Sequence, residues 1–179
     1  MDNISQGIVI RRLQPGDVTA LADLARDTFI ETFGHLYKAD DLAAFLKTAH
    51  APATYLALLQ NACMAIWVAE KSPGVLVGYA LAGPCKLPVP GLESSAGEIR
   101  QLYLLATAQK EGLGTRLLVT MLDWLVAQGH SPLYVGVWSG NPGAQRLYGR
   151  FGFEKIGEYD FPVGEHLDRE FIFRQRKSP

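Results

Sequence analysis

The stretch QKEGLGTRLL, residues 109–118, sets a Gly-x-Gly step between a predicted strand, EIRQLYLL (98–105), and a predicted apolar helix over 111–130 that ends at Gly129. A glycine-rich loop in this place leaves backbone N–H groups unpaired at the start of the helix. Those groups and the positive end of the helix dipole favour a bound phosphate. The stretch therefore predicts either a phosphate site or a plain glycine-containing helix start in a crossover between parallel strands.

Three phosphate-binding patterns compete for this loop. A Walker loop ends in Gly-Lys-Ser/Thr, whereas Gly114 is followed by threonine and arginine. A dinucleotide-binding fingerprint needs a third glycine where Leu117 stands. The third pattern, Gln/Arg-x-x-Gly-x-Gly/Ala, is matched by Gln109, Gly112 and Gly114. Because this pattern is short, the surrounding elements must decide between a phosphate site and a simple helix start.

Outside the loop, the chain alternates between strand and helix patterns. Pro15, Gly16 and Asp17 predict a turn and an N-cap for an amphipathic helix that reaches about His35. Residues 83–97 contain three prolines and three glycines, which predicts an irregular segment: the wall or lid of a site, or a mobile insertion. Further strands are predicted at 8–13, 63–70, 75–83, 132–138, 153–159 and 168–174, and further helices at 39–49, 52–61 and 141–151. This order predicts a mixed sheet with flanking helices.

Composition narrows the class of protein. A length of 179 residues predicts a single domain over 1–179 with a core that needs no metal or disulfide. The net charge of -1 gives no bulk attraction to nucleic acid or to an anionic membrane. Cys63 and Cys85 lack the spacing of a zinc or redox motif, which predicts free thiols. Because no targeting pattern or membrane-span pattern is visible, we expect a cytoplasmic protein with neither nucleic acid nor membrane as a partner.

A second motif lies at the expected distance after the glycine loop. The predicted strand 98–105, the loop, the helix, the strand LYVGVW (133–138) and NPGAQRLYGRFGFEKIG (141–157) together resemble the GNAT superfamily of acyl-CoA-dependent N-acetyltransferases. The resemblance covers about residues 8–174. It implies an α/β (α+β) GNAT fold, with a mixed, mostly antiparallel twisted sheet of six to seven strands flanked by helices. It also implies acetyl-CoA as cosubstrate, with the loop holding its pyrophosphate and with a second segment beside the thioester: Asn141, Ala144, Tyr148, Gly152 and Phe153.

Three further segments resemble a narrower group. DTFIETFG (27–34), GVWSGN (136–141) and FPVGEHLDREFI (161–172) are similar to the bacterial spermidine/spermine N-acetyltransferases of the PaiA type. This resemblance implies a polyamine or a related small amine as acceptor. Ser139 and Gly140 depart from that group's pattern, in which a bulkier charged residue precedes the asparagine.

Acetyl transfer to an amine needs a proton acceptor. A polyamine nitrogen has a pKa near 10, so at pH 7 only about one molecule in a thousand carries the free amine. Glu98 precedes Gly112 by fourteen residues, the spacing of the glutamate base in histone-acetylating members of the superfamily. We therefore expect Glu98 to accept the proton directly or through water, the alternatives being a water chain or a plain solvated carboxylate at a strand end.

The other chemical roles follow from the resemblance. A backbone N–H of Tyr103 or Leu104, freed where the strand splays, is expected to stabilise the oxyanion. Tyr148 is expected to protonate the departing thiolate, the alternative being an ordinary core tyrosine. Ala144 shares a helix face with Tyr148 and leaves room for the cofactor, and Asn141 is expected to cap that helix while bonding the pantetheine arm.

The candidate site residues fall into two sets. Cofactor contacts are expected from Leu102, Tyr103, Leu104, Gln109, Lys110, Gly112, Leu113, Gly114, Thr115, Asn141, Ala144 and Tyr148. Substrate contacts are expected from Phe29, Phe33, Tyr37 and Glu98, whereas each other acidic candidate is by itself expected to be inert: Glu31, Asp40, Asp41, Glu158, Asp160 and Glu165. The four histidines, His35, His50, His130 and His166, show no metal-binding spacing and are expected at the surface or in caps, so no metal is predicted.

Two alternatives to a small-amine acetyltransferase remain open from the sequence. One is an enzyme that acetylates a peptide or protein amine, including a protein N-terminus. The other is a non-catalytic acyl-CoA-binding module, which the presence of Glu98 and Tyr148 disfavours. A homodimer is compatible with the resemblance.

Overall fold

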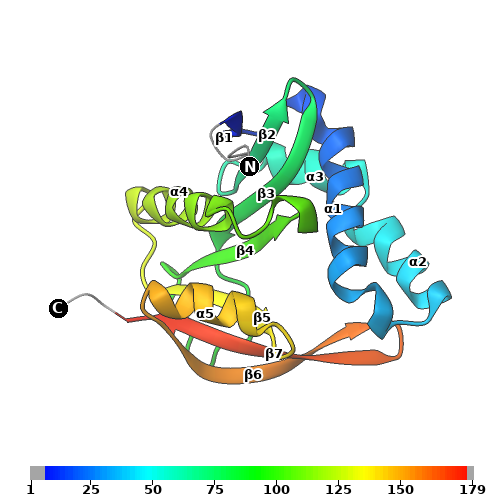
Figure 1. Ribbon diagram of the computed structural model, residues 1–179. Helices are drawn as coiled ribbons and strands as arrows, with labels where there is room; N and C mark the ends of the chain where they lie inside the picture. Colours follow the sequence, from blue (N-terminus) through cyan, green and yellow to red (C-terminus); the bar gives the residue numbers. More distant parts are fainter. Residues whose placement is uncertain (1–6, 177–179) are drawn as a thin grey trace.

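The computed structural model describes residues 7–176. Its helices are α1 (Val18–Phe33), α2 (Ala39–Ala49), α3 (Pro52–Gln60), α4 (Leu113–Ala127) and α5 (Pro142–Arg150), with short 3-10 turns at Pro15–Asp17, Gly34–Leu36 and Ala106–Ala108. Its strands are β1 (Val9–Arg12), β2 (Ala65–Ser72), β3 (Val75–Pro84), β4 (Gly97–Leu104), β5 (Leu133–Trp138), β6 (Phe153–Val163) and β7 (His166–Gln175). Within the described residues these strands form one sheet in the order β1-β2-β3-β4-β5-β7-β6 (Figure 1). All neighbours pair antiparallel except β4 and β5, so the predicted fold class is confirmed.

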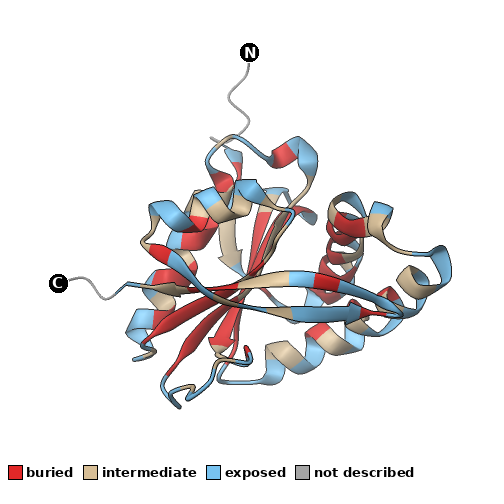
Figure 2. Ribbon diagram, turned by 90° about the horizontal axis from the view of Figure 1, so that it is seen from below, coloured by how far each residue is buried: buried red, intermediate tan, exposed pale blue. Residues whose placement is uncertain are grey.

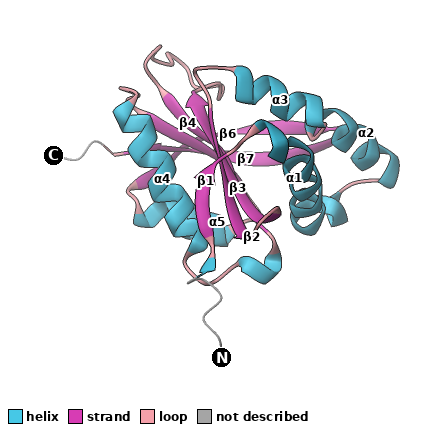
Figure 3. Cartoon of the chain, turned by 90° about the horizontal axis from the view of Figure 1, so that it is seen from above, coloured by secondary structure: helices cyan, strands magenta, loops and turns pink. Residues whose placement is uncertain are grey.

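Helices cover both faces of the sheet, with α4 and α5 on one side and α1, α2 and α3 on the other (Figure 3). The two-residue period of β2 explains this arrangement, because successive side chains point to opposite faces. Trp67 packs in the cluster that contains the buried residues of α4. Ile66 and Val68 pack in the cluster that contains those of α1. The central strands are consequently buried on both faces, as the red segments of Figure 2 show.

The sheet opens in its middle. The parallel ladder between β4 and β5 contains only Gly97–Ile99 paired with Leu133–Val135, and the two strands then separate. A register shift in the β3–β4 ladder occurs opposite the same point, where Leu81 pairs with Gln101 and Ala82 with Ile99. Such a bulge bends the strand and increases its twist. From Arg100 onward, the edge of β4 that faces β5 is therefore free to pair with something other than β5.

The last two strands form a longer hairpin than the sequence predicted. β6 continues to Val163 and β7 begins at His166, joined by a turn with Gly164 in the left-handed region at φ 59°. The hairpin runs beneath α1 and α2 at one end of the molecule (Figure 1). It carries Asp168 and Glu170 toward these helices, which lie far away in the sequence.

Asp17 lies at the start of α1, where the sequence predicts the N-cap. The side chain of Asp17 accepts the N–H of Gln14 at 2.9 Å, and it also binds Arg11, which in turn binds Glu70 at 2.8 Å. Asp17 is the N-cap residue of α1, as predicted, and the predicted turn over Pro15–Asp17 is also present. Its side chain makes no hydrogen bond to α1, however, because it caps the 3-10 turn that precedes the helix.

Candidate active site

Three adjoining hollows meet where β4 and β5 separate. The loop groove, about 510 Å³, lies between the glycine loop and α5. The strand gap, about 70 Å³, lies inside the split itself and shares Leu102, Asn141, Ala144 and Tyr148 with the loop groove. The aromatic cavity, about 320 Å³, lies between α1, α2 and the β6–β7 hairpin and shares Phe33, Tyr103 and Glu170 with the strand gap. The strand gap therefore shares lining residues with both of the other hollows.

The glycine loop adopts a backbone suited to a phosphate. Gly112 lies in the left-handed region at φ 77° and precedes α4, whose first N–H groups have no partner within the helix. Gln109 holds the loop to the end of β4, because its side-chain amide donates to the carbonyl of Leu104 at 3.1 Å. The helix dipole adds positive potential at the same end of α4.

Cationic side chains border the loop groove. Lys110 was predicted there, and Arg146 and Arg150 of α5 also line the groove. The two arginines are four residues apart and therefore share one helix face, a pattern that is visible in the sequence but absent from the predicted cofactor contacts. This cationic border and the free N–H groups fit the phosphates of coenzyme A.

Most of the predicted cofactor residues line the loop groove, but two of them do not place their side chains there. Leu102, Leu104, Gln109, Gly112, Gly114 and Thr115 line the loop groove together with Lys110, Asn141, Ala144 and Tyr148. The side chain of Leu113 is buried in the core at 1% exposure, so only its backbone can face a ligand. The side chain of Tyr103 lines the strand gap and the aromatic cavity instead of the groove.

Helix α5 places Tyr148 at the junction between the loop groove and the strand gap. The side-chain oxygen of Asn141 accepts the N–H of Ala144 at 3.0 Å, which confirms the predicted cap and fixes the start of the helix. Tyr148 is only 6% exposed, and burial raises the pKa of its phenol further above the ordinary value of 10. The hydroxyl therefore remains protonated and available as a donor at neutral pH.

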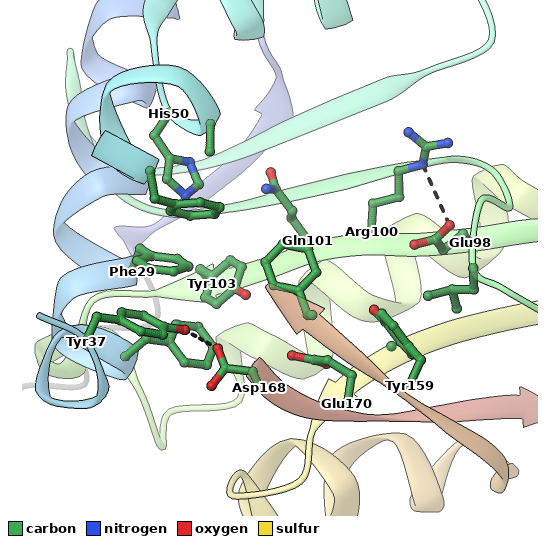
Figure 4. A pocket seen from close by; sticks show the side chains of 16 residues that line it. Phe29, Tyr37, His50, Glu98, Arg100, Gln101, Tyr103, Tyr159, Asp168 and Glu170 are labelled. Carbon is green, nitrogen blue, oxygen red and sulfur yellow. Dashed lines mark hydrogen bonds and ion pairs between the residues drawn. The ribbon is translucent and has the colours of Figure 1, made fainter. Parts of the chain in front are cut away.

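The aromatic cavity brings together rings from segments distant in the sequence (Figure 4). The predicted Phe29, Phe33 and Tyr37 all line it, with the ring centroids of Phe29 and Phe33 4.8 Å apart. Sequence reasoning missed three other aromatic residues of the lining: Phe45 from α2, and Tyr159 and Phe161 from β6. Tyr103 from β4, which was predicted as a cofactor contact, also lines the cavity.

Three carboxylates also line this cavity, of which only Glu98 was predicted. Glu98 is 8% exposed, accepts the N–H of Lys86 at 2.7 Å and lies 3.9 Å from the Nε of Arg100. Burial raises the pKa of Glu98 above its ordinary value. Its carboxylate is thus already engaged by the protein on at least one side.

The two missed carboxylates come from β7. Asp168 is 3% exposed, accepts a hydrogen bond from the hydroxyl of Tyr37 and lies 3.1 Å from the Nε2 of His166. The carboxylate of Glu170 makes no hydrogen bond or ion pair with any described residue. Burial, together with the negative charge of Asp168, raises the pKa of Glu170 to about 7.

Unpartnered polar atoms mark the same place. The Nε of Arg100 and the Oε1 of Gln101 are buried without a hydrogen-bond partner among residues 7–176, and both residues line the aromatic cavity and the strand gap. Buried polar atoms in proteins are nearly always satisfied, so orphans of this kind indicate contact with a polar ligand or water. The bulge in β4 accounts for their position.

The acidic candidates that the sequence placed elsewhere do not line the cavity. Glu31 accepts the N–H of Ala106 at 2.9 Å, and Glu158 and Glu165 pair with lysines on the exposed surface. Asp40, Asp41 and Asp160 are also absent from the lining. The expectation that each is inert toward the substrate agrees with these positions.

The irregular segment between β3 and β4 forms part of the cavity wall. Leu87 is buried, packs against Tyr134 and Ile172, and contributes to the lining. The N–H of Cys85 bonds the carbonyl of Ala96 at 2.9 Å, which closes the segment at its base. Of the predicted alternatives, the wall therefore describes this segment better than a mobile insertion does.

His50 was expected at the surface or in a cap and is in fact a buried cap. It ends α2, lines the aromatic cavity, and its Nδ1 lies 2.8 Å from the hydroxyl of Tyr55. Burial lowers the pKa of His50 to about 4, so the ring is neutral at physiological pH. No group of three or more His, Cys, Asp or Glu side chains in residues 7–176 could hold a metal ion, and no helix in that range is long and apolar enough to cross a membrane.

Comparison with known proteins agrees with this geometry. Residues 18–153 match the Acetyltransferase (GNAT) family. The "Uncharacterized N-acetyltransferase in pepI 3'region" of Lactobacillus delbrueckii subsp. lactis is 24% identical over 179 residues, covering 94% of this chain and 97% of that protein. The PaiA N-acetyltransferase of Thermoplasma acidophilum, solved in complex with coenzyme A, has a TM-score of 0.74 at 18% identity, covering 95% of this chain and 99% of its own. NAA60 of Arabidopsis thaliana, solved with a bisubstrate analogue, has a TM-score of 0.70 at 17% identity, covering 94% and 98% respectively.

Proposed function

Since the chain belongs to the GNAT family of acetyltransferases and is an acyl-CoA-dependent N-acetyltransferase, we propose that its acceptor is a polyamine or a related small primary amine. The observation that carries this proposal is the aromatic cavity. Its volume of about 320 Å³ is at the small end of ligand sites, which run from about 300 to 1,000 Å³. A cavity of that size fits a small molecule better than a folded protein surface.

The lining of the cavity suits a cation. Aromatic faces attract an ammonium group, and the attraction is larger where water is excluded. Glu98, Asp168 and Glu170 supply negative charge from two strands on different sides of the split. A molecule with two ammonium groups could place one nitrogen at the strand gap while a second remains beside Asp168.

The strand gap is the proposed position of the reacting groups. Acetyl-CoA bound in the loop groove would supply an acetyl group activated as a thioester. The unpaired edge of β4, including the N–H groups of Tyr103 or Leu104, is the proposed oxyanion donor, because fixed backbone N–H groups need no reorganisation during the reaction. Tyr148 is the proposed acid that protonates the departing thiolate.

A peptide or protein amine is the alternative acceptor, because the ribosomal-protein-alanine N-acetyltransferase of Brucella melitensis has a similar fold, with a TM-score of 0.65 at 21% identity. The wall formed by Leu87 and the β6–β7 hairpin argues against it, since an extended chain needs an open path to the strand gap.

A thiol-release assay with acetyl-CoA tests the proposal. The panel contains spermidine, spermine, 1,4-diaminobutane, butylamine and a set of peptides with free N-termini. We expect the diamines and polyamines to give the highest kcat/KM, with butylamine at least about tenfold lower, since it lacks the second ammonium group that would lie beside Asp168. Activity on peptides alone would reject the polyamine acceptor. Binding of acetyl-CoA without thiol release on any amine would instead favour a non-catalytic module.

A further inference from the structure

The carboxylates of the aromatic cavity differ in whether they also line the strand gap. Glu98 and Asp168 line the aromatic cavity but not the strand gap, whereas Glu170 lines both. Glu170 pairs across the β5–β7 ladder with Trp138, at the end of β5 that has separated from β4. Of the three carboxylates, Glu170 is therefore the one that an amine could contact both in the cavity and in the gap.

The carboxylates also differ in how far the protein occupies them. Glu98 is held by the N–H of Lys86 and lies beside Arg100, and Asp168 is held by Tyr37 and His166. The carboxylate of Glu170 has no such partner among the described residues, so its lone pairs are free for a substrate. A proton acceptor needs this freedom, because it must form a hydrogen bond to the proton that it removes.

We propose that Glu170, rather than Glu98, accepts the proton from the acceptor amine. This inference rests on the proposed function only in that the acceptor must be an amine, and it holds equally for a polyamine and for a peptide. Figure 4 shows Glu170 between the aromatic wall and Tyr159, with its carboxylate directed into the cavity.

The surroundings of Glu170 adjust its proton affinity to this role. The titratable and charged groups that face the same space come from five places: Asp168 on β7, with His166 beside it, Tyr159 on β6, Tyr103, Glu98 and Arg100 on β4, Tyr37 before α2, and His50, which is neutral at pH 7, at the end of α2. Arg100, the cation that lines the cavity, donates to the carbonyl of Pro84 at 2.7 Å and lies beside Glu98. Burial and Asp168 therefore dominate, and the resulting pKa of about 7 is well matched to proton transfer near neutral pH.

The proton balance of the step is simple. The substrate ammonium transfers one proton to the Glu170 carboxylate, and the neutral amine then forms a bond from nitrogen to the acetyl carbon. The bond between that carbon and sulfur breaks, and Tyr148 protonates the sulfur. The attacking nitrogen carries two protons after the new bond forms; it loses one of them, which restores the tyrosine, and keeps the other as the amide N–H. Glu170 releases its proton to solvent.

The pH dependence of kcat/KM distinguishes Glu170 from Glu98. Wild type, Glu170→Gln and the matched Glu98→Gln are assayed from pH 6 to 10 with the best amine of the panel, whether polyamine or peptide. We expect wild type and Glu98→Gln to rise through an inflection near pH 7. We expect Glu170→Gln to fall by about 10²–10⁴-fold at pH 7, to lose this inflection, and to rise about tenfold per pH unit toward the pKa of the free amine.

Three controls show whether a lower rate in Glu170→Gln reflects loss of the proton acceptor. The affinity for acetyl-CoA, measured by calorimetry, should agree between Glu170→Gln and wild type, because Glu170 does not line the loop groove. Glu170→Asp, which keeps the carboxylate, should recover part of the rate and the inflection. The wild-type profile is itself a test: no inflection between pH 6 and 8, or an inflection lost in Glu98→Gln and kept in Glu170→Gln, would overturn the inference. Activity on peptides alone would reject the polyamine proposal and leave this one standing.

Discussion

Replacing Glu170 by glutamine should stabilise the protein, and the gain should depend on pH. In the folded protein Glu170 keeps its proton up to a pH of about 7, whereas a glutamate in the unfolded chain loses it near 4.5. The difference corresponds to about 3 kcal/mol of unfavourable free energy once the folded protein carries the charge. Because part of the side chain faces the open cavity, solvent screening reduces the expected gain to about 1–3 kcal/mol.

The sign follows from proton binding. The folded pKa is raised, so Glu170 contributes no destabilisation below pH 4.5 and a growing one as the pH rises to 7, where the folded state still binds the proton that the unfolded chain has released. Glutamine cannot ionise and escapes this loss. We therefore expect wild type and Glu170→Gln to have similar stability at pH 5 and the variant to be more stable at pH 8.

Urea unfolding at pH 5, 6, 7 and 8 measures the effect directly, and thermal unfolding should show about 2–4 °C for each kcal/mol. Glu165→Gln removes one formal charge from a side chain that is 86% exposed, and it serves as the matched control. A stability difference between wild type and Glu170→Gln that is the same at every pH would refute the reasoning, as would a variant that loses stability relative to wild type between pH 5 and pH 8. Either result would mean that burial and Asp168 do not raise the pKa of Glu170.

Three other perturbations have definite expected outcomes. Asp168→Asn removes the negative charge that helps to raise the Glu170 pKa, so the acidic inflection of kcat/KM should move to lower pH; an inflection that stays in place would exclude electrostatic coupling between the two. Tyr148→Phe should retain acetyl-CoA binding within about twofold by calorimetry while kcat falls by about tenfold or more, and equal turnover would remove Tyr148 from the acid role. Gly112→Ala should lower the free energy of unfolding by about 1 kcal/mol and weaken acetyl-CoA binding, because φ is 77° at this position. Gly114→Ala should do neither, because the added carbon would lie 3.6 Å from the nearest atom. Equal effects of the two substitutions in urea unfolding and calorimetry would contradict this expectation.

The donor side of the site was predictable because its determinants are local. Gly112 and Gly114 lie within one loop and the helix that follows it, and Asn141 and Tyr148 lie at the two ends of one turn-helix segment. A backbone with positive φ, a helix start and an i, i+4 helix face each follow from a few consecutive residues. The cation pair Arg146 and Arg150 obeys the same rule and was available to the same reasoning.

The acceptor side could not be predicted in this way, because its residues meet only through long-range contacts. In DREFIFR (168–174), the aromatic residues Phe171 and Phe173 alternate with Asp168 and Glu170, which by itself predicts that the acidic face points to solvent. The structure shows that both faces are covered: Phe173 packs in the cluster of α4, and the acidic face turns toward α1 and α2. The helices that cover the acidic face become apparent only once β7 is known to pair between β5 and β6.

The separation of β4 from β5 connects these two sides and explains why a buried acidic site is tolerated there. Because the ladder ends at Ile99 and Val135, backbone groups of β4 are left without strand partners. Gln101 and Arg100 each have a buried polar atom without a hydrogen-bond partner among the described residues. Each unsatisfied buried group costs about 1–3 kcal/mol, and the charge on Glu170 adds a penalty of similar size above pH 7. These penalties fall on adjacent residues of one opening, where an ammonium group can offset the charge and an extended amide-containing arm can bond the strand edge. The same features that destabilise the free protein would therefore stabilise its complex with both substrates.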